Sequence, residues 1–329
     1  MCQREDGFIP HLIWNPRRKT WADRMLSLLW LSPYSSPYLG PPIIAEAVLR
    51  IYERTRDRNF LLETLPKIKA YYRYIGRRAC DSPIPPIIIS YESGKDRSRE
   101  YETPYGGSLS TPVWKGPIIK LMLHHSSLLY KEPLILKRDL FEVKDLFFSS
   151  LYAINLKSLS KLCEYAGDPD SAYFSALSSR VEEEILREMW DEEEGAFFSL
   201  YKGEKIKVLN ASTFLPLLFE KIEPYKVERL VKEHLLKDFW TNYPVPYDPY
   251  ISSDIDWRGK QTWIVINWYV VRGLEDKGYN KLAEVIKERS IELVMREGFR
   301  EWYDSETGEG GGALEFTPSA LILEFEGER

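Results

Sequence analysis

Cysteine, glutamine and long apolar runs are all scarce in this 329-residue chain. The three cysteines, Cys2, Cys80 and Cys163, are far apart and form no C-x-x-C pair, so neither a disulfide framework nor a zinc site is predicted. The longest apolar stretches, residues 25–31 and 83–89, are too short to span a bilayer. These absences argue against a disulfide-rich scaffold and a transmembrane helix.

Signatures of cofactor and nucleophile chemistry are also missing. The sequence has no G-x-S-x-G segment, P-loop or dinucleotide fingerprint, and its four histidines have no metal-binding spacing. We therefore expect no metal and no organic cofactor. Acidic and basic residues are interspersed, with a net charge of -5, which indicates neither a nucleic-acid partner nor a membrane partner. Glu5 and Asp6 stand where a signal peptide would begin, which predicts a cytoplasmic protein.

Composition gives three further indications. No Ser/Gly-rich linker divides the chain, which predicts one domain over residues 1–329. Glutamine occurs only as Gln3 and Gln261 while 29% of the residues are charged, a bias typical of proteins from hot environments. Aromatic residues reach 14%, and sugar rings stack against aromatic faces, although helix packing explains any single one of them equally well.

Helical spacing dominates the pattern, and strand signals are sparse. Pro41 and Pro42 suit the first turn of a helix whose stripe is Ile44, Val48 and Ile51. Consecutive helices separated by short breaks indicate a helical repeat domain, with an open solenoid as the rival of a closed barrel. Further helices are predicted from Asn59 to Ile75 and over residues 142–165, with Asn155 on the apolar face of the second. After a break at Gly167 to Pro169 the next helix reaches Trp190; another runs from Thr262 to Lys277, and after a break at Gly278 one continues to about Arg296. Thr317 and Pro318 are expected as the N-cap and first position of a last helix.

A shorter repeat follows two of these helix pairs. Trp190-Asp191 is followed by Gly195, and Tyr303-Asp304 by Gly308. In both places a glycine comes four residues after an aromatic-Asp pair. The chain therefore repeats one local plan outside the helices as well.

The segment E-S-G-K-D-R-S, residues 92–98, contains the first candidate for chemistry, Asp96. It follows Ser93-Gly94, where a tight turn would aim the carboxylate inward. A glycosidase protonates the departing oxygen with one carboxyl group and, if it inverts configuration, activates water with a second. The alternative is a surface-loop aspartate. Arg97 or Arg99 pointing at Asp96 would lower its pKa, the wrong direction for a proton donor.

Glu301 is the second candidate. It lies between Phe299 and Trp302 at the end of a predicted helix, where partial desolvation of the carboxylate is expected. A solvated glutamate beside a loop is the alternative. The D-S-E-T-G-E-G-G-G that follows resembles part of a calcium loop but does not fit the full pattern. We interpret its glycines as a segment that folds close to a pocket floor.

A third segment runs from Trp257 to Trp263 and leads into a helix. Arg258 could hold a carboxylate or a pair of hydroxyls in its guanidinium fork. Asn267 shares an apolar helical face with Trp263, so it is either a satisfied core amide or a hydrogen-bonding group that points into a cavity. The nearby Trp257 and Arg258 favour the cavity.

In their order along the chain, these segments resemble glycoside hydrolase family 63 and its mannosylglycerate hydrolase group, with a more distant likeness to trehalases. Each motif is weak alone, but the order is specific and covers most of the chain. The matching segments are Gly7 to His11 with Ile13-Trp14, Pro41-Pro42, E-S-G-x-D at Glu92 to Asp96, Trp190-Asp191, Phe214 to Leu217, W-R-G at Trp257, Arg272 to Leu274 with Gly278-Tyr279, and F-x-E-x-Y-D with T-G-E-G near the end.

The resemblance implies an all-α fold, an (α/α)6 toroid, and an inverting mechanism in which Asp96 is the general acid and Glu301 the general base. It implies a small α-glucoside or α-mannoside as substrate, such as mannosylglycerate, glucosylglycerate or a short oligosaccharide. Arg97, Arg99 or Arg258 could recognise a carboxylate on the leaving group. The residues expected to bind substrate are His11, Trp14, Tyr91, Glu92, Trp257, Arg258, Trp263, Asn267 and Trp302.

The family normally begins with a Trp-Asp-rich helix that has no counterpart in this sequence. We therefore expect a barrel that is incomplete at its N-terminus, which self-association or a second chain would complete. Two other functions stay open. A carbohydrate-binding barrel without hydrolysis predicts thermal stabilisation by ligand without turnover, and a helical scaffold for protein partners predicts an exposed concave face.

Overall fold

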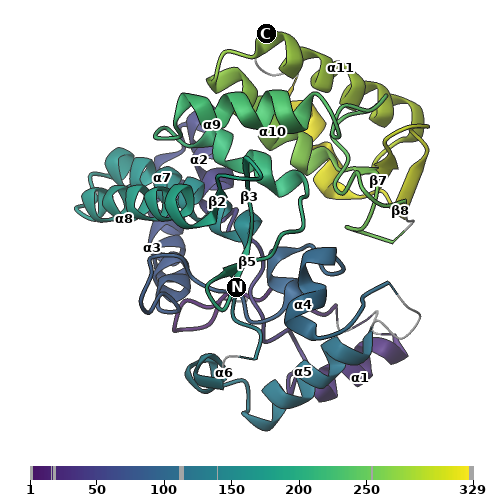
Figure 1. Ribbon diagram of the computed structural model, residues 1–329. Helices are drawn as coiled ribbons and strands as arrows, with labels where there is room; N and C mark the ends of the chain where they lie inside the picture. The colour runs from purple at the N-terminus through teal and green to yellow at the C-terminus, as the bar shows by residue number, and fades with distance from the viewer. Residues whose placement is uncertain are drawn as a thin grey trace. The chain divides into compact units, whose positions relative to one another are not determined.

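The computed structural model describes residues 3–15, 17, 20–110, 115–138, 140–252 and 255–325. The chain forms two compact units that alternate along the sequence, and helices predominate in both (Figure 1). The first unit comprises Met1–Asp96, Glu100–Arg187 and Ser199–Ile206, and the second comprises Arg97–Arg99, Glu188–Phe198 and Lys207–Arg329. The single domain over residues 1–329 stays a prediction.

The first unit is built around α7 (Leu146–Ala166), which is buried along most of its length. It packs against α2 (Ile44–Thr55), α3 (Arg58–Gly76) and α8 (Ser171–Glu184), and α8 lies alongside it in Figure 1. An antiparallel sheet joins β1 (Val143–Lys144), β4 (Leu200–Tyr201) and β5 (Glu204–Lys205) in that order. The other helices are α1 (Trp21–Leu29), α4 (Glu102–Tyr105), α5 (Lys115–Ser127), α6 (Glu132–Arg138) and the 3-10 helix η1 (Ser90–Ser93).

In the second unit, α10 (Ile264–Asp276) packs against α11 (Asn280–Glu297) and the 3-10 helices η4 (Ala211–Leu218) and η6 (Thr317–Glu324). Strands β6 (Gln261–Thr262), β7 (Arg300–Asp304) and β8 (Gly310–Leu314) form one antiparallel sheet. Strands β2 (Trp190–Asp191) and β3 (Ala196–Phe197) form a hairpin. Helix α9 (Pro224–Arg229) continues into the π-helical turn η5 (Leu230–Leu235). Two short turns, η2 (Arg99–Tyr101) and η3 (Ile185–Met189), each include residues of both units.

Side-chain caps and a buried amide explain why α7 forms where it does. Asp145 precedes the helix and accepts a hydrogen bond from the Phe148 N–H at 2.7 Å, and Gly167 ends it with φ of 71°. In its middle, Asn155 Oδ1 accepts hydrogen bonds from the Glu46 N–H at 2.8 Å and the Tyr72 hydroxyl at 3.0 Å. The predicted helix and the position of Asn155 on its apolar face are thus confirmed.

The buried face of α2 differs from the predicted stripe. The helix begins at Ile44, as Pro41-Pro42 indicated, but Ile51 is 46% exposed while Leu49 and Tyr52 are buried. The predicted stripe is therefore right at Val48 and wrong at Ile51, because the buried face is rotated towards Leu49 and Tyr52. The rotation of a helix about its axis depends on the elements it packs against, here α7 and α3.

The two aromatic-Asp segments adopt the same turn. The Gly195 N–H donates to the Asp191 carbonyl and the Gly308 N–H to the Asp304 carbonyl, each at 2.8 Å. Both glycines have positive φ, 65° and 74°, which disfavours other residues. The Asp304 carboxylate also accepts N–H groups within its turn, at 2.7 and 2.9 Å. The repeat in the sequence therefore corresponds to the turns of the β2–β3 and β7–β8 hairpins.

A buried ion pair fixes the segment before Asp96. Arg78 holds Glu92 with two hydrogen bonds, of 2.6 and 2.9 Å, and donates a third, of 2.6 Å, to Glu132. The side chains of Arg78 and Glu92 have no solvent exposure. Glu92 also accepts the N–H groups of Leu39 and Ile88, both at 3.0 Å. Its oxygens are therefore saturated by protein donors.

Replacing Arg78 by methionine is expected to lower the free energy of unfolding by about 3–5 kcal/mol, because the buried Glu92 carboxylate would lose its cation. Chemical denaturation measures this. Lys67→Met is the control, since it removes an exposed pair with Glu63 on the surface of α3 and should change stability by less than about 0.5 kcal/mol. Equal effects in the two variants would contradict the structural role of Arg78.

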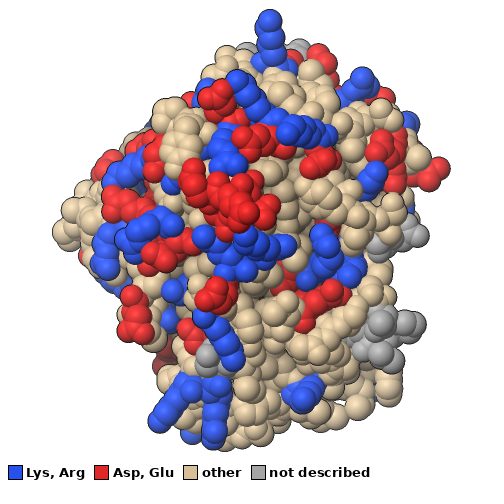
Figure 2. Space-filling view, viewed as in Figure 1, with Lys and Arg blue, Asp and Glu red and all other residues tan. Residues whose placement is uncertain are grey.

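The surface agrees with the dispersed charge of the sequence. On the face drawn in Figure 2, basic and acidic side chains are interspersed. Within the described part of the chain, no helix has both the length and the apolar character needed to cross a bilayer. Cys80 is exposed and Cys163 is buried, both as free thiols, and Cys2 lies outside the described residues.

Candidate active site

The two candidate carboxylates belong to different units, Asp96 to the first and Glu301 to the second. Each group of site residues is therefore described within its own unit. His11, Trp14, Tyr91 and Glu92 accompany Asp96, and the other predicted site residues accompany Glu301.

Asp96 follows a tight turn, as its sequence predicted. The 3-10 helix η1 ends at Gly94, whose N–H donates to the Tyr91 carbonyl at 3.2 Å and whose φ is 74°. The Asp96 side chain is half-buried. Its charge adds to burial in raising the pKa of the Tyr91 and Tyr105 phenols well above their usual range. The carboxylate therefore lies close to two phenol rings.

Aromatic rings surround this part of the first unit. The His11 ring lies 6.0 Å from both Tyr91 and Trp30, and Trp14 stacks on Trp30 at 5.4 Å between ring centroids. His11 Nδ1 is hydrogen-bonded to the Ser36 hydroxyl at 2.6 Å. Burial lowers the pKa of His11 to about 4, so the imidazole is neutral at physiological pH. The structure thus brings His11, Trp14 and Tyr91 into one aromatic neighbourhood.

Glu92 has a structural position. Its side chain is fully buried and saturated by Arg78 and two backbone N–H groups. A carboxylate without solvent exposure and without spare lone pairs is poorly placed to bind a sugar hydroxyl. Glu92 is better described as the anchor of the loop than as the substrate contact that the resemblance implied.

Glu301 lies in β7 where the register with β8 shifts. Arg300 pairs with Leu314 and Trp302 with Gly311, so the extra residue is in β8, opposite Glu301. Its Oε2 accepts a hydrogen bond from the Ala313 N–H at 2.8 Å. A Cβ atom at Gly312 would approach Glu301 Oε2 to 2.6 Å, and Gly312 also has φ of 66°. The glycine run is therefore explained by β8 passing close under the side chains of β7.

Electrostatics at Glu301 involve a residue that the sequence analysis did not single out. Burial raises the pKa of Glu301, the bond from Ala313 lowers it, and the nearby Asp256 carboxylate raises it, with a net upward shift. Asp256 accepts a hydrogen bond from the Trp302 indole N–H at 2.7 Å. Asp256 thus ties Trp302 in place and favours the protonated form of Glu301. Its position directly before W-R-G was the available signal.

Trp257 and Trp263 form a stacked pair, with ring centroids 3.6 Å apart and an angle of 11° between the rings. Tyr247 packs edge-on against Trp257 at 5.2 Å. Trp263 is only 2% exposed, whereas Trp257 is partly exposed and has φ of 59°, an unusual value for a large side chain. Trp257 is therefore the ring available to a ligand, and Trp263 supports it.

Asn267 has the alternative role that its sequence left open. Its side chain is fully buried, its amide donates to the Pro244 carbonyl and to the Ser290 hydroxyl, both at 2.8 Å, and its oxygen accepts the Val245 N–H at 3.0 Å. These contacts describe a satisfied core amide. The preference for a cavity-facing Asn267 is therefore not supported.

The three arginines differ in their surroundings. Arg99 forms two hydrogen bonds to Asp248, of 3.0 and 3.3 Å, and so already has a carboxylate partner within the protein. Burial and the neighbouring Arg258 lower the pKa of Arg97, and Asp256 raises it. Arg258 is 8% exposed. Arg97 and Arg258 are thus neighbouring guanidinium groups, and the Asp256 carboxylate lies near Arg97.

The described residues of neither unit form a metal centre. Among them, no cluster of three or more His, Cys, Asp or Glu side chains is arranged to hold a metal ion. The Asp304 carboxylate in the calcium-like stretch accepts N–H groups of its own turn, from Glu306 and Thr307.

Comparison with known proteins gives the family. A profile described as the mannosylglycerate hydrolase MGH1-like glycoside hydrolase domain matches residues 1–319. A mannosylglycerate hydrolase from Thermus thermophilus is 27% identical, over 98% of this chain and 86% of that protein. A glucosylglycerate hydrolase from Mycolicibacterium hassiacum is 22% identical, over 99% of this chain and 85% of that one.

A solved structure extends the comparison to three dimensions. It is a family 63 mannosylglycerate hydrolase, also from Thermus thermophilus, in complex with Tris and D-glycerate, and it matches with a TM-score of 0.87 and 26% identity. The match covers 98% of this chain and 85% of that chain. The predicted all-α (α/α)6 fold class is thereby confirmed. Sequence, structure and profile agree that the chain belongs to the mannosylglycerate hydrolase MGH1-like family of glycoside hydrolases.

Proposed function

We propose that this protein is an inverting glycosidase that hydrolyses a small α-glycoside of glyceric acid, with Asp96 as general acid and Glu301 as general base. One observation carries the proposal. Relatives that align with nearly the whole chain hydrolyse mannosylglycerate and glucosylglycerate, two compounds with different sugars and the same glycerate leaving group. The shared leaving group is the better guide to the substrate class.

In the proposed reaction, Asp96 gives its proton to the glycosidic oxygen as the bond from that oxygen to the anomeric carbon breaks. Water attacks the same carbon from the opposite face, and Glu301 removes a proton from the attacking water. The products are free glycerate and the sugar with inverted anomeric configuration. Inversion requires space for water, so the two carboxyl groups are expected about 6.5–9.5 Å apart in the substrate complex.

Glu301 is suited to the role of base. The Ala313 N–H, which belongs to the irregular part of β8 opposite Glu301, holds its carboxylate in one orientation. Its pKa is raised by burial and by Asp256, which makes the ionised form a stronger base. Trp257 is proposed to stack against the sugar, with Trp263 behind it.

Arg97 and Arg258 are proposed to bind the glycerate carboxylate. They lie close enough together for Arg258 to lower the pKa of Arg97, so an anion beside both would offset their repulsion. Arg99, the third arginine considered, forms two hydrogen bonds to Asp248.

The test is hydrolysis of a panel consisting of mannosylglycerate, glucosylglycerate, trehalose and methyl α-mannoside. Hydrolysis of one or both glycerate compounds, at least about tenfold faster in kcat/KM than methyl α-mannoside, is expected. Preference for methyl α-mannoside or trehalose would contradict a glycerate site. Binding of the glycerate compounds without turnover, by folded protein, would support the carbohydrate-binding alternative.

The acid limb of the pH profile is expected to report Glu301. The base works when ionised, so kcat/KM should fall as pH drops through a midpoint above the ordinary value of 4.5. Asp256→Asn removes a negative neighbour and makes Glu301 easier to ionise, so this variant should shift the limb to lower pH. Asp276→Asn, at an exposed position in α10, is the control. An upward shift or an unchanged limb in Asp256→Asn would refute this account of Glu301.

A further inference from the structure

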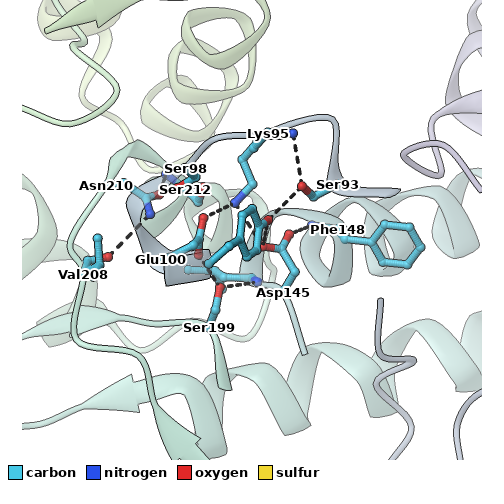
Figure 3. Close-up of polar contacts among 12 residues, drawn as sticks. Ser93, Lys95, Ser98, Glu100, Asp145, Phe148, Ser199, Val208, Asn210 and Ser212 are labelled. Atoms are coloured by element: carbon cyan, nitrogen blue, oxygen red, sulfur yellow. Dashed lines mark hydrogen bonds and ion pairs between the residues drawn. The ribbon is translucent and has the colours of Figure 1, made fainter. Parts of the chain in front are cut away.

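Lys95, the residue before Asp96, is completely buried. Its ammonium group donates to Glu100 Oε1 at 2.6 Å and to Asp145 Oδ2 at 3.0 Å (Figure 3). The side chains of Lys95 and Asp145 have no exposure, and that of Glu100 has 3%. The sequence E-S-G-K-D-R-S suggests a solvated loop, so this buried charge cluster needs an explanation.

The cluster is complete in its hydrogen bonds. Asp145 Oδ2 also accepts the Tyr101 hydroxyl at 2.7 Å, and Asp145 Oδ1 caps α7. Glu100 Oε2 accepts the Ser199 hydroxyl at 2.7 Å. Two aromatic rings, those of Tyr101 and Phe147, lie 5.6 Å from the ammonium group. Such an arrangement has one geometry in which every group is satisfied, and displacement of any member leaves a buried charge unpaired.

These contacts attach the chain on both sides of Asp96 to α7. Before Asp96, the Ser93 hydroxyl oxygen lies 2.7 Å from the Tyr101 hydroxyl oxygen and accepts the Lys95 N–H at 3.1 Å. After Asp96, the Glu100 carboxylate accepts a hydrogen bond from the Lys95 ammonium group. Asp145 connects both to the first turn of α7, a helix of 21 residues in the core of the unit. The backbone that carries Asp96 is thus fixed at residues 93, 95 and 100.

Stability alone does not account for the charges. Apolar residues that fill the same volume are often as stabilising as a buried ion pair, or more so. What the ionic cluster adds is a defined orientation, because each hydrogen bond specifies a distance and a direction. A proton donor benefits from that, since a displacement of about 1 Å can cost on the order of a hundredfold in rate.

We infer that Lys95, Glu100 and Asp145 position the general acid Asp96, by fixing its backbone so that its carboxyl group can protonate the glycosidic oxygen. The inference rests on the proposed function of Asp96. Lys95 itself is a positioning residue, because its ammonium group is directed away from solvent into the cluster and is bonded to Glu100 and Asp145.

The experiment compares leaving groups. A glycerate glycoside needs the proton from Asp96, whereas the 2,4-dinitrophenyl glycoside of the same sugar has a leaving group that departs without one. Lys95→Met should lower kcat on the glycerate substrate by on the order of a hundredfold with KM within a few-fold, and should change kcat on the dinitrophenyl substrate by less than about tenfold. Glu100→Gln and Tyr101→Phe, which keep the shape of the cluster, should show the same selectivity more weakly.

Lys69→Met is the matched control. Lys69 also bridges two carboxylates, Asp168 at 2.6 Å and Asp170 at 2.5 Å. These residues belong to the same unit but lie outside the segment that carries Asp96. Its rate ratio between the two substrates should equal that of the wild type.

Asp96→Asn distinguishes a failure of the positioning role from a failure of the proposed function of Asp96. If Asp96→Asn loses activity selectively on the glycerate substrate while folded Lys95, Glu100 and Tyr101 variants keep the wild-type ratio, the positioning role is overturned and the proposed function stands. If Asp96→Asn itself shows no selectivity, the assignment of Asp96 falls, and the positioning role falls with it. Should Lys95→Met fail to fold, the two milder variants decide the question by the same ratio.

Discussion

Glu301→Gln is expected to lower kcat by roughly 10²–10⁴-fold, the range that general base catalysis supplies. Glutamine has the same shape and can still accept the Ala313 N–H, so the pairing of β7 with β8 should persist and KM should change little. What it cannot do is take a proton from water. Initial rates with the best glycerate glycoside of the panel, combined with thermal denaturation, measure the loss and the integrity of the fold.

Azide provides a second readout of the same variant. It attacks carbon without needing a base, so it should restore bond cleavage in Glu301→Gln and give a glycosyl azide of inverted configuration. Glu309→Gln, at an exposed position in the same hairpin, is the control and should retain wild-type rates. Full activity in Glu301→Gln would remove Glu301 from the mechanism.

Asp96→Asn is expected to lower kcat on a glycerate glycoside by a similar factor, roughly 10²–10⁴-fold, because asparagine cannot supply the proton that the alkoxide leaving group needs. Its loss on a dinitrophenyl glycoside should be far smaller. The basic limb of the pH profile should also disappear, since that limb reports deprotonation of the acid. Steady-state kinetics across pH on both substrates measures these effects together.

Asp81→Asn changes an exposed aspartate of the same unit and serves as the matched control, with no effect expected on either substrate. Equal losses on the two substrates in Asp96→Asn would indicate that Asp96 supports the structure and does not deliver a proton. Retention of full activity would exclude it from the site.

Local signals predicted much of the fold. Helical spacing and the breaks at Gly167 and Gly278 predicted α7, α10 and α11 to within a few residues. The helix predicted to reach Trp190 corresponds to α8 followed by the π-helical turn η3, and the aromatic-Asp repeat corresponds to a repeated hairpin turn. The face of α2 was not predictable in the same way. Ile51 fits the apolar spacing of its own helix, but packing against α7 and α3 buries Leu49 and Tyr52 and leaves Ile51 exposed.

In the candidate site, too, local features were predicted from the sequence, whereas features that depend on distant residues were not. The turn at Gly94 and the close packing of glycines near Glu301 follow from residue types and were anticipated. The buried state of Lys95 was not, because its partner Asp145 is 50 residues away. Likewise, the amide of Asn267 is satisfied by Pro244 and Ser290, each 23 residues distant, and no local pattern distinguishes that from a group aimed into a cavity.

The most direct test of the account is the anomer released in the first moments of hydrolysis, observed by proton NMR with α-mannosylglycerate, or with α-glucosylglycerate if that is the better substrate. The account predicts that the β-anomer of the free sugar appears first and that the α-anomer follows only by mutarotation. Initial appearance of the α-anomer would mean retention, and it would contradict the assignment of Asp96 as acid and Glu301 as the base that activates water.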